Sequence, residues 1–108
     1  MQSSSETIQR LVQRIVTEVN PLRIILFGSA ATDQMQPDSD IDLLVVMPEG
    51  VHRRRIAQLL YQRIRGIARP FDIIVATPSD LEKHQDNIGL IYRTILQEGR
   101  EVYAARTF

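Results

Sequence analysis

Two apolar segments of strand length, Leu22–Phe27 and Ile41–Val46, constrain this chain most, because two aspartates stand at the start of the second. Side chains alternate between the faces of a strand, so Asp40 and Asp42 point to one side of a sheet and the residue between them points to the other. Two like charges side by side are costly unless a cation lies between them. Carboxylate oxygens suit Mg²⁺ or Mn²⁺, so a divalent metal is the simplest candidate for that cation.

A helix is predicted over Ser3–Val19, ahead of the first strand. Ser3 and Glu6 have the spacing of a capping box, and Asn20–Pro21 ends the helix because the residue before proline avoids helical geometry. The apolar residues of this segment follow the i, i+3, i+4 spacing of one buried stripe. They are Ile8, Leu11, Val12, Ile15, Val16 and Val19.

A second helix is expected over about Val51–Ile67, with apolar residues at helical spacing and with Gly66 and Pro70 closing it. The segment that follows, Phe71–Ala76, is mostly apolar, which is typical of a strand inside a sheet. We therefore expect it to be a central strand.

The last part of the chain predicts two helical segments and a short strand. Ser79 and Glu82 have capping-box spacing within Pro78–Glu82, which begins a third helix. Gly99 is placed to end a later helix as its C′ residue, and Glu101–Ala104 is expected to form a last strand. The later helix carries one apolar stripe, made of Ile88, Ile91, Tyr92, Ile95 and Leu96.

This order of elements predicts an α/β fold, in which a small mixed β-sheet packs against helices. The link between the first two strands suits either a parallel crossover or a wide antiparallel loop, so strand direction stays open. A length of 108 residues fits a single domain, which we expect to span residues 1–108.

Charge and composition exclude several classes of protein. Thirteen basic and thirteen acidic residues cancel, so no overall field draws the chain to nucleic acid or to a membrane. There is no cysteine, which excludes disulfides and thiolate metal sites. No apolar run reaches the ~18 residues of a membrane span, and the N-terminus is polar, so a cytoplasmic location is expected.

Three further residues complete a candidate site. Asp72 lies one residue into an apolar strand, and as a general base it would accept a proton from an attacking hydroxyl. Gly28 would let a ligand approach the backbone, and a helix beginning at Ser29 would direct N–H groups at phosphate oxygens. Taken singly, these features also fit a strand-end aspartate paired with Arg69, a plain turn and a solvated acidic loop.

Together, Gly28–Ser29, ten residues (30–39), the Asp40-x-Asp42 pair and the later Asp72 resemble the minimal nucleotidyltransferase (MNT) family of the DNA polymerase β-like superfamily. The resemblance covers most of the chain and implies the polymerase β-like nucleotidyltransferase fold. It also implies that the three aspartates bind Mg²⁺ or Mn²⁺ and carry catalysis. Gly28 and Ser29 would then contact the triphosphate of ATP.

The chain departs from the family pattern at Thr32 and Asp33, where many relatives carry Arg-Gly. Losing a cation and gaining an anion beside a phosphate site should weaken nucleotide binding by about 1 kcal/mol.

The resemblance implies a transferase that moves AMP from ATP to a hydroxyl of a partner protein. The chain ends soon after its core, so we expect a partner or self-association in a homo-oligomer to supply acceptor choice. In the family, such domains pair with a helical HEPN-domain toxin, and the MNT protein is the antitoxin. The competing hypothesis is a binding module that neutralises its partner by contact alone. A third, a transferase acting on an antibiotic or nucleic acid, lacks an acceptor domain or basic groove.

Overall fold

The computed structural model describes residues 4–28, 40–67, 69–82 and 87–105. Its elements are α1 (Ser4–Val19), β1 (Arg23–Phe27), β2 (Ile41–Val46), α2 (Arg53–Arg63), β3 (Phe71–Ala76), α3 (Pro78–Glu82), α4 (Asn87–Glu98) and β4 (Arg100–Ala104). Ser3, the first member of the predicted capping box, lies outside the described residues.

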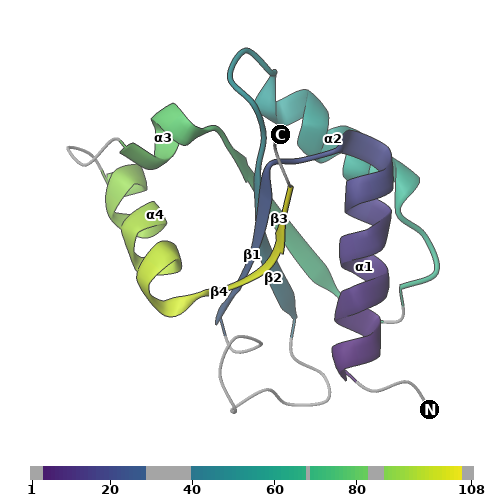
Figure 1. Cartoon of the computed structure of the whole chain (residues 1–108). Helices are drawn as coiled ribbons and strands as arrows, with labels where there is room; N and C mark the ends of the chain where they lie inside the picture. Colours follow the sequence, from purple (N-terminus) through teal and green to yellow (C-terminus); the bar gives the residue numbers. More distant parts are fainter. Residues whose placement is uncertain (1–3, 29–39, 68, 83–86, 106–108) are drawn as a thin grey trace.

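The four strands form one mixed sheet in the order β3-β2-β1-β4. β1 pairs antiparallel with both β2 and β4, whereas β2 and β3 are parallel. Residues 28–40 therefore connect antiparallel neighbours, which settles the strand direction. In Figure 1, α1 and α2 cover one face of the sheet and α3 and α4 lie on the other, so the predicted α/β class is confirmed.

α1 packs its apolar stripe on the sheet as predicted, with Leu11 and Ile15 completely buried. It ends at Val19, and the next residue, Asn20, has a positive φ of 51° and donates its N–H to the carbonyl of Val16 at 3.0 Å. Each buried aliphatic side chain contributes about 1.5–3 kcal/mol of transfer free energy. The core on this face is made of Ile8, Leu11, Val12, Ile15, Ile24, Leu26, Ile41, Leu43, Val45, Met47, Leu60, Ile64, Ile73 and Val75.

α2 is shorter than predicted. His52 caps its start, accepting a hydrogen bond from the N–H of Arg55 at 3.4 Å, and Ile64 ends it in an extended conformation. Ile64 and Ile67 still pack into the core, beyond the helix. The prediction that Gly66 and Pro70 close the helix was wrong, because α2 ends at Arg63. The side chains of Ile64 and Ile67 reach the core from an extended segment instead of from a helix.

β3 is an edge strand, so the prediction of a central strand was wrong. It is apolar because both of its faces are buried. One face packs in the core beneath α2, and the other packs in a second core beneath α4. Tyr61 of α2 covers part of the open edge: its hydroxyl accepts a hydrogen bond from the N–H of Ile73 at 2.8 Å. The Tyr61 ring stacks on Phe71 with centroids 5.7 Å apart. An edge N–H that would otherwise face solvent is thereby paired.

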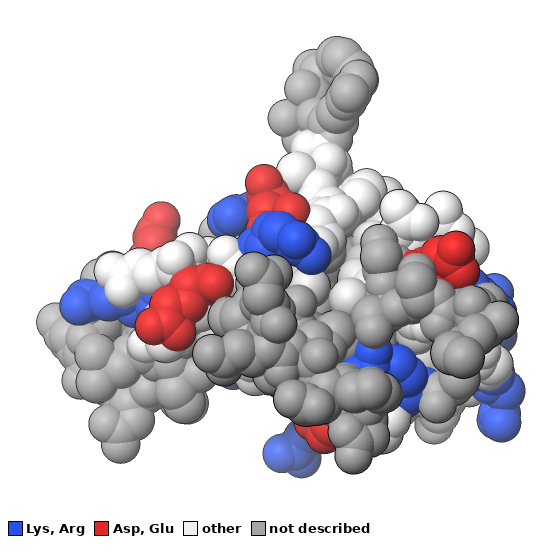
Figure 2. All heavy atoms as spheres, turned by 90° about the horizontal axis from the view of Figure 1, so that it is seen from below, with Lys and Arg blue, Asp and Glu red and all other residues white. Residues whose placement is uncertain are grey.

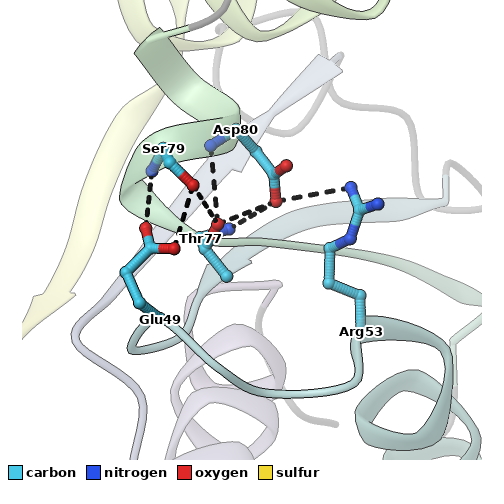
Figure 3. A network of polar contacts seen from close by, with 5 residues as sticks. All are labelled: Glu49, Arg53, Thr77, Ser79 and Asp80. Atoms are coloured by element: carbon cyan, nitrogen blue, oxygen red, sulfur yellow. Dashed lines mark hydrogen bonds and ion pairs between the residues drawn. The ribbon is translucent and has the colours of Figure 1, made fainter.

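The start of α3 is capped by Thr77 and Asp80, and not by the predicted pair Ser79 and Glu82 (Figure 3). The carboxylate of Asp80 accepts from the N–H of Thr77 at 2.9 Å, and the Thr77 hydroxyl accepts from the N–H of Asp80 at 3.4 Å. Ser79 instead donates its N–H and its hydroxyl to the carboxylate of Glu49, at 2.7 and 2.9 Å. The capping box therefore begins two residues earlier than predicted.

A second core fills the space between the sheet and α4. Tyr92 and Ile95 of the predicted stripe are buried there, whereas Leu96 is 37% exposed and the prediction for it was wrong, because it lies outside the buried arc. The core consists of Ile25, Leu44, Val46, Ala76, Tyr92 and Ile95. Within the described ranges, no helix is long and apolar enough to cross a membrane.

Candidate active site

The end of β1 and the starts of β2 and β3 meet at one end of the sheet. Phe27 is paired with Asp42 across the antiparallel ladder, and Asp42 is paired with Asp72 across the parallel one. Neighbouring strands lie about 4.8 Å apart, so these two aspartates are adjacent. From the sequence alone, Asp72 could lie near Asp42 only if their two strands were neighbours in the sheet. The parallel pairing of β2 with β3 shows that they are.

Asp42 and Asp72 lie on the face of the sheet that carries the second core. Along β2, Leu44 and Val46 belong to that core, whereas Ile41 and Leu43 belong to the first. Because faces alternate, Asp42 shares the face of Leu44 and is half-buried. Asp72 and Asp40 are exposed. The site is therefore one half-buried carboxylate with two exposed carboxylates beside it.

The electrostatics of the site centre on Asp42. Partial burial raises the pKa of its carboxyl group, and the charges of Asp72 and then Asp40 raise that pKa further. Burial removes water from the ionised carboxylate, and the neighbouring anions repel its negative charge, so both favour the protonated form. The charges of Asp72 and Asp40 therefore both act on the carboxyl group of Asp42.

Gly28 closes the site from the β1 side. It has a positive φ of 72°, and a Cβ built on it would collide with Oδ2 of Asp42 and lie 3.3 Å from its Cγ. Gly28 is needed here for both its backbone conformation and its lack of a side chain. Sequence reasoning identified Gly28 as a point of ligand approach but missed its contact with Asp42, which only the strand register reveals.

Part of the predicted site lies outside the described residues: Ser29, together with Thr32 and Asp33. Among the residues that the structure does describe, no three acidic or histidine side chains are arranged as a metal-binding group. Asp40 and Asp72 are exposed, so their side chains can change rotamer without disturbing the core. The coupled anionic charge and the hard oxygen donors fit a divalent cation such as Mg²⁺ or Mn²⁺.

Figure 2 shows the molecule from the end at which these strand ends meet. Acidic and basic side chains are interspersed among the described residues on this face, and neither sign forms a continuous field there.

Comparison with known families places most of the chain in one of them. The family model described as "Nucleotidyltransferase domain" matches residues 8–102. No curated protein matches the chain.

Solved structures share the fold at low sequence identity. A candidate nucleotidyltransferase from Sulfolobus solfataricus is 18% identical, with a TM-score of 0.62, covering 91% of this chain and 78% of that one. Spectinomycin adenyltransferase from Enterococcus faecialis, solved with ATP and spectinomycin, is 15% identical with a TM-score of 0.65; the match covers 97% of this chain but only 58% of that one. A toxin–antitoxin structure with AMP-PNP is 19% identical, with a TM-score of 0.55 and coverage of 96% and 76%.

Proposed function

Because this chain belongs to the nucleotidyltransferase domain family, we propose that it transfers a nucleoside monophosphate, AMP from ATP, to a hydroxyl of a partner protein. The observation that carries the proposal is the register that pairs Asp42 with Asp72, with Asp40 nearby. Placing the half-buried Asp42 beside two other carboxylates, whose charges raise its pKa, is unfavourable for folding. It is what a cation-dependent transferase needs.

In this proposal Asp40, Asp42 and Asp72 hold Mg²⁺ or Mn²⁺. When bound, the cation would neutralise charge on the triphosphate and on the departing pyrophosphate. Asp42 is fixed by β2 and by Gly28, so it sets the position of the group, whereas the exposed Asp40 and Asp72 adjust around it.

Asp72 is proposed as the general base. Its exposure leaves it open to an acceptor hydroxyl, and it would take the hydroxyl proton as the oxygen attacks. The acceptor oxygen forms a bond to the α-phosphorus, the bond from that phosphorus to the bridging oxygen breaks, and pyrophosphate leaves. Gly28 and Ser29 are proposed to let the phosphates approach the backbone, which requires a residue without a side chain at the end of β1.

The acceptor is proposed to be a protein encoded as a toxin partner, such as a HEPN-domain protein, with this chain as the antitoxin in the cytoplasm. The fold shared with a toxin–antitoxin structure that holds AMP-PNP supports this choice. Spectinomycin adenyltransferase shares the same fold, so the experiment below decides between the two classes of acceptor. A formal net charge of zero supplies no overall field toward a nucleic-acid acceptor.

The experiment incubates the protein with ATP labelled at the α-phosphorus, Mg²⁺ and the protein encoded beside it, with Asp42→Asn as the control. Label on the partner that is lost in Asp42→Asn supports the enzyme. Neutralisation of the partner by both forms without label in either supports instead the binding module, to which Thr32 and Asp33 would point.

A further inference from the structure

A shallow hollow lies between α1 and the segment after α2, on the face of the sheet opposite Asp42. Four of its lining residues are spaced i, i+3, i+4 and i+7 along α1 and so form one exposed stripe. The hollow is lined by Arg10, Gln13, Arg14, Thr17, Arg65 and Ile67. Five of these six side chains can donate hydrogen bonds, and three of them are cationic.

The guanidinium of Arg14 is held in place from both elements. It donates a hydrogen bond to the carbonyl of Arg63 at 3.1 Å and lies 3.7 Å from the carboxylate of Glu18. Arg10 and Arg65 form no ion pair with any residue in the described ranges. The lining of the hollow therefore holds three guanidinium groups and no carboxylate, and only that of Arg14 lies near an acidic side chain, Glu18, within the described ranges. The hollow is locally positive in a chain whose total charge is zero.

We infer that this hollow docks an acidic segment of the partner protein that supplies the acceptor hydroxyl, an inference that rests on the proposed function. Guanidinium groups bind carboxylates through paired, charge-assisted hydrogen bonds, and Gln13 and Thr17 add neutral donors. No aromatic side chain lines the hollow, so it lacks the platform on which single-stranded RNA bases stack. The neutral chain also lacks the field that draws nucleic acid.

Docking on this face leaves the carboxylate site open. α1, which lines the hollow, packs with α2 on one face of the sheet (Figure 1), whereas Asp42 lies on the other face. A partner held at the hollow can therefore present a hydroxyl around the edge of the sheet, and tethering raises the effective concentration of that hydroxyl at the site.

The test measures binding of a fluorescent oligoglutamate peptide to the full chain at low salt by anisotropy, with an oligouridylate RNA of equal charge in a parallel titration. The double variant Arg10→Glu/Arg65→Glu should weaken peptide binding by about tenfold or more, since attraction is replaced by repulsion. The matched control, Arg54→Glu/Arg93→Glu, makes the same charge change at exposed sites outside the hollow and should leave binding within about twofold.

Equal losses in both double variants would overturn the inference, because binding would then follow net charge. Tighter binding of the RNA than of the peptide, or no binding of the peptide, would also overturn it. Stabilisation by Mn²⁺ and ATP is measured on the same variants. Its retention in Arg10→Glu/Arg65→Glu shows that the active site is intact, and its absence from the unmodified chain would instead defeat the proposed function.

Discussion

Gly28 lies directly against the carboxylate of Asp42, and no side chain fits between them. A Cβ on Gly28 would collide with Oδ2 of Asp42, while the backbone of Gly28 has a φ of 72°. The turn that ends β1 and the carboxylate that begins β2 therefore form one unit. A side chain introduced at Gly28 should therefore displace the carboxylate of Asp42.

Gly28→Ala should destabilise the protein by about 2–4 kcal/mol, the sum of the left-handed backbone cost and of overpacking against Asp42. Gly50→Ala is the matched control, because Gly50 has a φ of 92° and nothing within 4 Å of an added Cβ. It should lose only the backbone part, about 1–2 kcal/mol. Urea unfolding measures both, and equal losses would show that the contact with Asp42 is unimportant.

Asp42→Asn should stabilise the metal-free protein near neutral pH while removing stabilisation by Mn²⁺ and ATP. The folded pKa of Asp42 is raised by burial and by Asp72 and Asp40. The native state therefore holds this proton more tightly than the unfolded state does. Protonation of Asp42 therefore adds to the free energy of unfolding. This contribution is complete below the pKa that Asp42 has in the unfolded state, and it is lost as pH rises through the higher pKa of the folded state.

Thermal unfolding measured across that pH range should show the metal-free protein losing stability as pH rises, with a weaker decline in Asp42→Asn. Parallel pH profiles for the two proteins would contradict the raised pKa of Asp42.

Tyr61→Phe should cost about 1 kcal/mol, because it removes the hydroxyl that pairs the N–H of Ile73 and keeps the ring stacked on Phe71. Hydrogen exchange at the Ile73 amide should become faster, while exchange at core amides of β2 should change only with global stability. An unchanged Ile73 amide would mean that the hydroxyl does not close the edge of β3.

Glu49→Gln should reduce stability near neutral pH but not in acid. Hydrogen bonds from the N–H and hydroxyl of Ser79 lower the pKa of Glu49. A lowered folded pKa gives stability that is present above the unfolded pKa and lost as pH falls through the folded one. The melting temperatures of the two proteins should therefore converge as the carboxylate is protonated, and a constant gap would exclude this carboxylate as the cause.

The sequence predicted correctly those helices and strands whose residue pattern lies within a single segment of the chain. The apolar stripe of α1 has helical spacing, and β1 and β2 are apolar runs of strand length, and the structure follows both patterns. β3 was predicted as a central strand but lies at an edge of the sheet. An apolar run shows that both faces of a strand are buried, but it does not show whether the strand has a neighbour on each side. α2 was overextended because Ile64 and Ile67 reach the core from an extended segment, which helical spacing does not distinguish.

The candidate site was predictable as a set of residues but not as a geometry. Strand alternation in the sequence predicts that Asp40 and Asp42 share a face, whereas β2 itself begins at Ile41, one residue after Asp40. The pairing of Asp42 with Asp72 depends on a parallel register between strands separated by α2, and no local pattern encodes it. The contact of Gly28 with Asp42 depends in the same way on the antiparallel register of β1 and β2.

The most direct test of nucleotidyl transfer compares ATP labelled at the α-phosphorus with ATP labelled at the γ-phosphorus, each incubated with the chain, Mg²⁺ and its partner protein. Transfer through Asp40, Asp42 and Asp72 should place the α label on the partner and release the γ label in pyrophosphate. Partner labelled from the γ position, or unlabelled from both while the partner is still neutralised, would contradict the proposed function.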